Sequence, residues 1–376
     1  MQPGAFFFRV FPSSSVRTGL LITATAGFMT FGSAQAMVRV PGYTDGTWIN
    51  TSGGTISWSY NSGENSTKNW AGGKIASGAG ATADFSTIDI VKDTTISLTE
   101  GGITVANLIF GDKDPATAAG WLVSGSTLTL SPVPGSISVP TITVNALGKG
   151  ESATINSTVA GTNGLNKEGM GTLTLGGIIG NTYTGNTTVN AGTLALDKTK
   201  GAAAIVGTSI TINSGGTLLL QAPDQIAKTT NLNLNGGTFS TGTGFSESLG
   251  ALTLTSDSVI SLGASLHNLT FGASSSALWS PTATLTIYGW SATGGIGGTF
   301  GSIFFGANAE ALTSDQLRQI KFDGYSGATL LSTGELVPMA VPEAQTYLAA
   351  LLLGGLVLWR EKSRRFLLRH PHVIPA

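Results

Sequence analysis

The chain has 376 residues, no cysteine and only 10% charged residues, against about 25% in typical globular proteins. Residues 37–340 hold 18 acids and 12 bases, a net charge of −6, which argues against nucleic acid as a partner, because phosphate binding needs a basic face. The abundant Gly, Thr, Ser and Asn indicate strands and turns, and 41% apolar residues in alternation favour a packed core over disorder.

The N-terminus has the pattern of a signal peptide. Arg9 and Arg17 precede an apolar run over residues 19–31, and a small-x-small motif follows, with Ala34 and Ala36 as its small residues. We expect residues 1–36 to be removed after Ala36 by signal peptidase, whose pocket admits small side chains. An exported chain without cysteine must be stabilised by repeated backbone pairing and packing in place of disulfides.

Residues 37–94 are expected to form an N-terminal β cap region. They contain Trp48, Trp58 and Trp70. We interpret these aromatic side chains as a cover for the first coil of a solenoid, because an uncovered β end invites aggregation. A sugar-stacking platform is the alternative.

The sequence "GDKDP" over residues 111–115 offers Asp112 and Asp114 as possible calcium ligands. It lacks the further oxygen ligands and the glycine spacing of known calcium loops. We therefore predict an ordinary solvated turn, for which Asp and Pro are common residues.

A repeat occupies the middle of the chain. Its units alternate apolar and polar residues, then place Asn and a small residue before the next strand; they include "TITVNALG" (141–148), "TTVNAGTLAL" (187–196), "SITINSGGTLLL" (209–220) and "NLNLNGGTFS" (231–240). Spacings of 21, 24, 23 and 22 residues separate the recurring asparagines, which are Asn145, Asn166, Asn190, Asn213 and Asn235. A period in the twenties is typical of a solenoid, in which each unit buries its apolar face against its neighbours.

The alternation selects the kind of solenoid. Leucine-rich repeats need a leucine consensus that is absent here, whereas strand, Asn-Gly turn and strand recur. We predict an all-β fold, a parallel β-helix over residues 95–290, right-handed because parallel crossovers almost always are. The asparagines are interpreted as a structural ladder of stacked amides at turns, with a ligand site as the alternative. The expected inward residues are Ile142, Val144, Val189, Leu194, Leu196, Ile210, Ile212, Leu218, Leu232, Leu234 and Phe239.

Residues 291–340 are expected to cap the far end of the solenoid. Thr313 and Gln316 have the spacing of a helix capping box. We predict a short helix there, with Leu312, Leu317 and Ile320 covering the last coil.

The tail, residues 341–376, differs from the rest of the chain. An uncharged run of 13 residues over 347–359 precedes a basic cluster that includes Arg360, Lys362, Arg364 and Arg365. A bilayer span needs about 20 apolar residues, so the run is marginal, yet the bases behind it are typical of a stop on the cytoplasmic side. We expect a transmembrane helix, with a buried C-terminal helix as the alternative.

Two segments resemble known families. Residues 166–196, "NKEGMGTLTLGGIIGNTYTGNTTVNAGTLAL", resemble the autotransporter-associated beta-strand repeat. The tail resembles a PEP-CTERM sorting signal, which implies a sorting motif at Val341, Pro342, Glu343 and Ala344, although Ala344 stands where the signature has proline. The resemblance implies the export machinery, signal peptidase and an exosortase-like transpeptidase as partners, with exopolysaccharide as a further candidate.

The repeat region has no recognisable arrangement of catalytic residues. The acids between residues 141 and 290 do not keep a common position relative to the asparagines, arginine is absent between Arg39 and Arg318, and His267 has no nucleophile beside it in sequence. No motif of a hydrolase, zinc protease or nucleotide-binding loop is present. We therefore predict no catalytic residue, metal or cofactor, and a non-catalytic surface or matrix protein of structural or adhesion type. The alternatives are a β-helix polysaccharide lyase or glycosidase, a sugar-binding protein, and an autotransporter passenger exported by separate machinery.

Overall fold

The computed structural model describes residues 42–59, 69–98, 101–199, 201–292, 297–325, 327–339 and 352–362. These all belong to one compact unit, residues 40–376. The signal cleavage residues Ala34 and Ala36 lie outside the described residues. So do Arg364, Arg365 and the sorting motif Val341, Pro342, Glu343 and Ala344.

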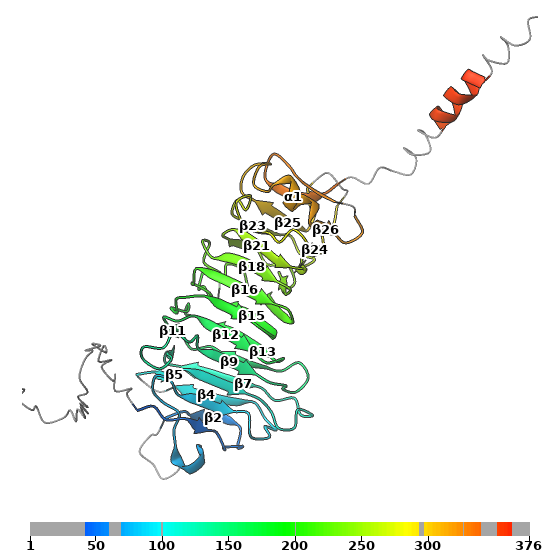
Figure 1. Cartoon of the computed structure of the whole chain (residues 1–376). Coiled ribbons are helices and arrows are strands. Elements are labelled where there is room, and N and C mark those ends of the chain that lie inside the picture. The colour runs from blue at the N-terminus through cyan, green and yellow to red at the C-terminus, as the bar shows by residue number, and fades with distance from the viewer. Residues whose placement is uncertain are drawn as a thin grey trace, which may run out of the picture. The chain divides into compact units, whose positions relative to one another are not determined.

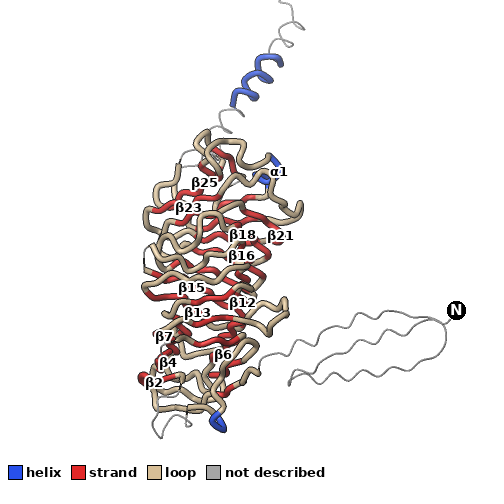
Figure 2. Tube along the Cα trace, turned by 90° about the vertical axis from the view of Figure 1, so that its left-hand side faces the viewer, coloured by secondary structure: helices blue, strands red, loops and turns tan. Residues whose placement is uncertain are grey.

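The described residues between 42 and 339 fold as a parallel β-helix, as predicted (Figures 1 and 2). Two long parallel sheets of nine and eleven strands run along it, and neighbours in each sheet are strands from successive coils. The nine-stranded sheet contains β1 (Gly46–Thr47), β3 (Thr82–Phe85), β6 (Asn107–Phe110), β9 (Thr141–Val144), β12 (Leu165–Glu168), β14 (Thr187–Val189), β16 (Ser209–Asn213), β18 (Asn231–Asn235) and β21 (Leu252–Ser256).

From β2 to β22, each strand of the second long sheet comes after a strand of the first along the chain, and β24 and β26 extend the second sheet further. It contains β2 (Gly54–Ser57), β4 (Thr94–Leu98), β7 (Trp121–Gly125), β10 (Ser152–Ile155), β13 (Thr172–Gly177), β15 (Gly192–Lys198), β17 (Gly216–Leu220), β19 (Thr238–Ser240), β22 (Ser258–Ser261), β24 (Leu285–Tyr288) and β26 (Ile320–Phe322). A short third sheet contains β5 (Ile103–Val105), β8 (Leu128–Leu130) and β11 (Val159–Gly161). A fourth contains β20 (Glu247–Leu249), β23 (His267–Phe271), β25 (Gly301–Phe305), β27 (Ala328–Leu330) and β28 (Glu335–Pro338).

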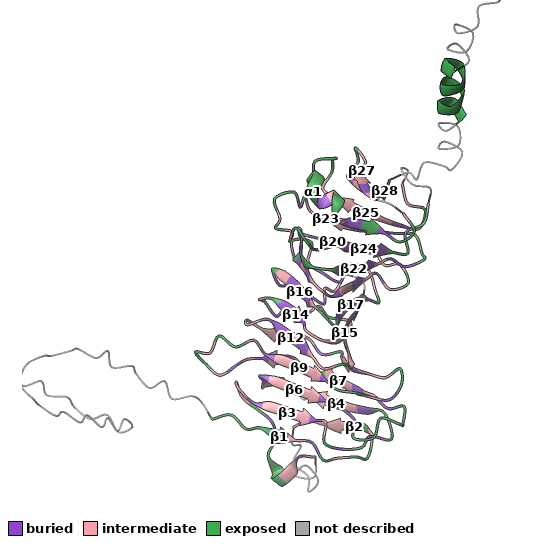
Figure 3. Ribbon diagram, turned by 45° about the vertical axis from the view of Figure 1, so that its right-hand side comes forward, coloured by how far each residue is buried: buried purple, intermediate pink, exposed green. Residues whose placement is uncertain are grey.

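The core is made of in-register columns of apolar side chains. Along the eleven-stranded sheet, Leu194 pairs with Leu218, and Leu218 pairs with Phe239. Buried and partly exposed residues alternate along the strands (Figure 3), because successive side chains of a strand point to opposite faces. Every predicted inward residue is fully buried, which confirms Ile142, Val144, Val189, Leu194, Leu196, Ile210, Ile212, Leu218, Leu232, Leu234 and Phe239.

The parallel pairing extends beyond the predicted range of 95–290 at both ends. Before residue 95, β1 already pairs with β3, and β2 pairs with β4, which begins at Thr94. At the other end β24 pairs with β26, which ends at Phe322. The segments expected to be caps therefore also contribute coils, because their short strands keep the register of the neighbouring coil.

The tryptophans near the N-terminus pack against each other inside the first coils. Trp48, Trp58 and Trp70 are all buried, with ring centroids 5.1–5.3 Å apart for Trp48–Trp70 and Trp58–Trp70. The indole N–H of Trp58 donates to the carbonyl of Ala76, and that of Trp70 donates to Trp58. Their faces are covered, so they do not form a sugar-stacking surface. The 3-10 turn η2 (Ala71–Gly73) follows Trp70.

At the other end, the predicted helix is confirmed as α1 (Ser314–Arg318). Thr313 Oγ1 accepts from the backbone N–H of Gln316, and Gln316 Oε1 accepts from the N–H of Thr313, which completes the capping box. Leu312 and Ile320 are buried and Leu317 packs against the core. Beside them β28 pairs antiparallel with both β25 and β27, which ends the parallel stacking of the fourth sheet.

Part of the tail is also described. Residues 352–362 form a helix whose side chains are exposed, Arg360 and Lys362 among them. Within the described ranges, none of the helices combines the length and the apolar content that crossing a membrane requires.

Candidate functional site

A row of polar side chains crosses the nine-stranded sheet from β12 to β21, at the carboxyl ends of these strands. Asn213 donates through Nδ2 to Oδ1 of Asn190 at 2.5 Å, and Asn235 donates to Oδ1 of Asn213 at 2.7 Å. Asn190 in turn donates to Oε1 of Glu168 at 2.5 Å. Three of the predicted asparagines therefore form the expected coil-to-coil ladder.

The prediction is wrong for the other two. Asn166 pairs in register with Thr141 and Thr188. It therefore lies two residues before Glu168, which is the member of its coil in the polar row. Asn145 follows β9 beyond Thr143, the residue of that coil that pairs with Glu168. The uneven spacings of 21 and 24 residues around Asn166 are the physical reason, because strand pairing fixes register by position in the coil and the turns absorb the difference.

Lys167 occupies an inward position of the same sheet. It pairs with Ile142 on one side and with Val189 on the other, and it is fully buried. Its ammonium group donates to three carbonyls, those of Glu168, Gly169 and Ala191, at 2.8–3.0 Å. Burial lowers the pKa of Lys167 to about 8. The three carbonyls show that this lysine closes the corner of a coil, which leaves it no free donor for a ligand.

A second buried polar group lies at another corner. Gln225 makes hydrogen bonds to both the N–H and the carbonyl of Lys198, and its own N–H donates to Oε2 of Glu247 at 2.6 Å. The Lys198 ammonium is buried with a single long contact, 3.5 Å to the carbonyl of Ser157, and burial lowers its pKa to about 8. Burial raises the pKa of Glu247 to about 7. These groups hold neighbouring coils together.

The remaining titratable candidates also have structural partners. His267 is buried; its Nδ1 donates to the carbonyl of Ser265 and its Nε2 accepts from the Thr241 hydroxyl. That tautomer follows because a carbonyl can only accept. Asp112 Oδ1 accepts from the N–H groups of Ile90 and Asp114, as expected for a turn. The predicted solvated turn is nevertheless wrong for Asp112, because the fold buries this residue. No cluster of three or more metal-ligating side chains occurs among the described residues.

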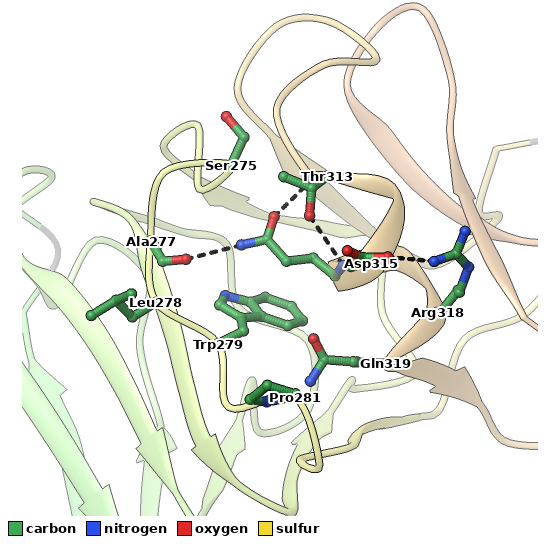
Figure 4. A pocket seen from close by; sticks show the side chains of 10 residues that line it. Ser275, Ala277, Leu278, Trp279, Pro281, Thr313, Asp315, Arg318 and Gln319 are labelled. Atoms are coloured by element: carbon green, nitrogen blue, oxygen red, sulfur yellow. Dashed lines mark hydrogen bonds and ion pairs between the residues drawn. The ribbon is translucent and has the colours of Figure 1, made fainter.

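An open pocket lies between the loop over residues 272–283 and α1, and we call it the Trp279 pocket. It has a volume of about 540 Å³. In Figure 4 the Trp279 ring lies between the loop and the helix, with Gln319 and Pro281 beside it. Its lining residues are Ser275, Ala277, Leu278, Trp279, Pro281, Thr313, Asp315, Gln316, Arg318 and Gln319.

Two glutamines hold the walls of this pocket together. Gln316 Nε2 donates to the carbonyls of Ser274 and Ala277 at 2.9 and 3.1 Å. Gln319 Nε2 donates to the carbonyls of Ser280 and Ala283 at 2.5 and 2.8 Å. The helix is thus fixed to the loop, and the pocket shape does not depend on a ligand.

Sequence reasoning did not find the Trp279 pocket. The capping box at Thr313 was visible, but the pairing of α1 with a loop some 40 residues earlier depends on how the last coils stack. One signal was present: Gln316 and Gln319 stand three residues apart and so share a helix face. The sequence analysis also assigned no role to Lys167 and Lys198, which the fold buries at coil corners.

Comparison with known proteins supports the repeat. Residues 165–196, which form β12, β13, β14 and most of β15, match the passenger-associated transport repeat. This segment is an autotransporter-associated repeat. The autotransporter adhesin BmaC of Brucella suis biovar 1 (strain 1330) is 38% identical over 125 residues, which are 32% of this chain and 3% of that adhesin. The chain therefore spans a small part of the length of this relative. No solved structure matches the chain.

The repeat contains the features described above. It holds Lys167 with its three carbonyl acceptors, and it holds Glu168 and Asn190, where the polar row begins. The matched segment therefore contains the long-sheet strands of two successive coils, β12 with β13 and β14 with β15, and both the Lys167 corner bonds and the Asn190–Glu168 bond between the coils lie within it.

Proposed function

We propose that this protein is an exported, non-catalytic adhesion-type protein of the cell surface or extracellular matrix, in which the β-helix is a rigid scaffold. The observation that carries the proposal is the passenger-associated repeat built into a continuous parallel β-helix. The similarity of part of the chain to an autotransporter adhesin supports the same role.

The polar groups of the coils support a role as scaffold. Glu168, Glu247 and His267 each make hydrogen bonds to neighbouring coils. Glycosidases instead use two carboxylates facing a substrate about 5 to 9.5 Å apart. Groups already used to join coils are poor candidates for acid–base catalysis, so the polysaccharide lyase or glycosidase is the weaker hypothesis.

The tail supports sorting through the membrane. The helix over residues 352–362 exposes a continuous set of large apolar side chains that includes Leu352, Leu356 and Trp359. Arg360 and Lys362 follow them directly. Exposed apolar surface of this kind marks contact with a membrane or a partner, and basic residues behind it favour the cytoplasmic side. An exosortase-like transpeptidase would then act at Val341–Ala344 after export.

The proposal is tested by expressing the full chain in a bacterium that has an exosortase-type sorting system. Protease added to intact cells should digest the full chain but not a cytoplasmic marker protein, and the cells should adhere to a glycan-coated surface. Deletion of residues 347–376 should release soluble protein into the medium, and Ala344→Pro should increase the processed fraction. Retention of the whole chain in the cytoplasm contradicts export, and an unchanged membrane fraction after the deletion shows that the tail is not the anchor.

A further inference from the structure

We propose that the Trp279 pocket binds an uncharged sugar ring of a polysaccharide, stacked on the indole of Trp279. This inference rests on the proposed function and names the ligand class through which adhesion would occur.

The ring of Trp279 is held in place and partly exposed. Its Nε1–H donates to the carbonyl of Leu252 in β21 at 2.9 Å, and its backbone pairs with Leu254. The indole cannot turn away without losing that bond. An aromatic face carries partial negative charge, which suits the slightly positive C–H groups on one side of a pyranose ring. A fixed and accessible indole is therefore a stacking surface for a sugar.

Free hydrogen-bonding groups surround the ring. Gln319 uses only Nε2 in its bonds to the loop, and within the described part of the chain its Oε1 has no partner. Thr313 Oγ1 accepts from Gln316, which leaves its hydroxyl proton available. Asp315 and Arg318 also line the pocket, with their charged groups paired to one side of the Trp279 ring in Figure 4. Donors and acceptors mixed in this way match hydroxyl groups, which both donate and accept.

The charge of the pocket favours a neutral ligand. Asp315 and Arg318 are the only charged residues that line it, and they form an ion pair with each other. Their charges compensate, so neither an anionic nor a cationic ligand gains net attraction. A polyuronate or a strongly basic peptide is therefore disfavoured relative to an uncharged sugar.

Rigidity and size agree with this ligand. Gln316 and Gln319 fix α1 to the loop before any ligand arrives, which lowers the ordering cost of binding. The volume of about 540 Å³ lies in the range of small-molecule sites, about 300–1,000 Å³. The site can hold one or two sugar rings of a chain.

The test is calorimetric titration of the purified full chain, kept in a detergent without a sugar headgroup. The probes are maltohexaose, cellohexaose and chitohexaose, with hexagalacturonate as the charged comparison. We expect saturable binding of at least one neutral probe with a Kd of about 1 mM or tighter. Trp279→Ala should weaken it about tenfold or more, as expected for an aromatic anchor, and Trp279→Phe should weaken it less.

Two further variants separate binding from folding. Arg318→Ala and Asp315→Ala truncate exposed side chains outside the core, and each should weaken the same probe about threefold or more, because each removes a hydrogen bond to a hydroxyl group. The matched control is Tyr288→Ala, another partly exposed aromatic residue, on β24 and away from the pocket. It should leave binding unchanged.

Three results would overturn the inference. The first is that no neutral probe binds at up to about 10 mM, which is well above the limit for weak specific sites. The second is that Trp279→Ala binds as tightly as the wild type. The third is that hexagalacturonate binds more tightly than every neutral probe. In any of these cases surface display of the full chain is unaffected, so loss of the sugar site and failure of the proposed function are told apart.

Discussion

Asn190 Nδ2 lies 2.5 Å from Oε1 of Glu168, so a carboxylate starts the polar row of the nine-stranded sheet. An ionised carboxylate only accepts hydrogen bonds, which forces the amide of Asn190 to donate toward it. Asn213 and Asn235 then point the same way. The hydroxyls of Thr255 and Ser256 donate to Oδ1 of Asn235 and end the row. The bonds therefore run in one direction through five consecutive coils.

Replacing the central member of this row should destabilise the solenoid. Asn213→Ala removes the bonds to Asn190 and Asn235 together, and we expect a loss of about 1–3 kcal/mol in the free energy of unfolding. Urea unfolding followed by circular dichroism measures it. Asn166→Ala is the matched control, because Asn166 lies in the same sheet but outside the row. Equal losses in the two variants would show that the row adds no stability.

The two buried lysines should respond in opposite ways to the same substitution. Lys167→Met leaves three carbonyls without their donor and should destabilise the protein by about 1–3 kcal/mol. Lys198→Met removes a buried charge with one long contact and should be neutral or stabilising at pH 7. Thermal unfolding of both variants beside the wild type decides between the two effects.

The pH dependence of Lys198 follows from its lowered pKa. Because burial lowers the pKa to about 8 from 10.5, the folded state binds fewer protons than the unfolded state between these values, and stability rises with pH there. This rise should be smaller in Lys198→Met than in the wild type. An identical pH profile would mean that Lys198 titrates normally.

Glu247 should make the protein less stable as the pH rises from about 4.5 to 7. Burial raises its pKa from 4.5 to about 7, so its protonated form stabilises the folded state below pH 4.5, and this contribution is lost as the pH rises through 7. The full change corresponds to about 3 kcal/mol. Glu247→Gln keeps an acceptor for Gln225 and should flatten the melting temperature over this range. Glu310→Gln, at an exposed position, should keep the wild-type profile.

Close approach of coils should make one glycine irreplaceable. A Cβ atom on Gly207 would lie 1.8 Å from the carbonyl oxygen of Gly185 in the coil below. Gly207→Ala therefore requires the two coils to separate and should cost about 4 kcal/mol or more. Gly42→Ala meets no atom within 4 Å and should leave the urea midpoint unchanged. A stable, unshifted Gly207→Ala variant would contradict this tight stacking.

The sequence predicts the periodic part of the fold well. Alternation identifies inward residues such as Val189 and Leu218, since burial on one face of a strand leaves a period of two. The same reasoning assigned Lys167 no role, because a buried lysine breaks the pattern and only the carbonyls of the folded corner explain it. The prediction that Asn145 and Asn166 join the row was wrong, because similar sequence motifs do not fix strand register when the turns between them differ in length.

The Trp279 pocket could not be derived in the same way. Its walls come from a loop and a helix in different coils, and the contacts of Gln316 and Gln319 with that loop exist only after stacking. Periodicity describes what repeats, whereas this site forms where the repeat ends. The capping box of α1 was predictable because its bonds join Thr313 and Gln316, three residues apart.

The in-register pairing of β13, β15 and β17 allows the number of coils to change without altering either end. Thr172 pairs with Thr193, and Thr193 pairs with Thr217, so loss of one whole coil brings equivalent residues face to face. Each coil gained or lost changes the distance between the buried tryptophans and Trp279 by about 4.8 Å. Unequal recombination between similar coils can thus set the length of this protein in steps, while natural selection acts separately on the surface that the last coils present.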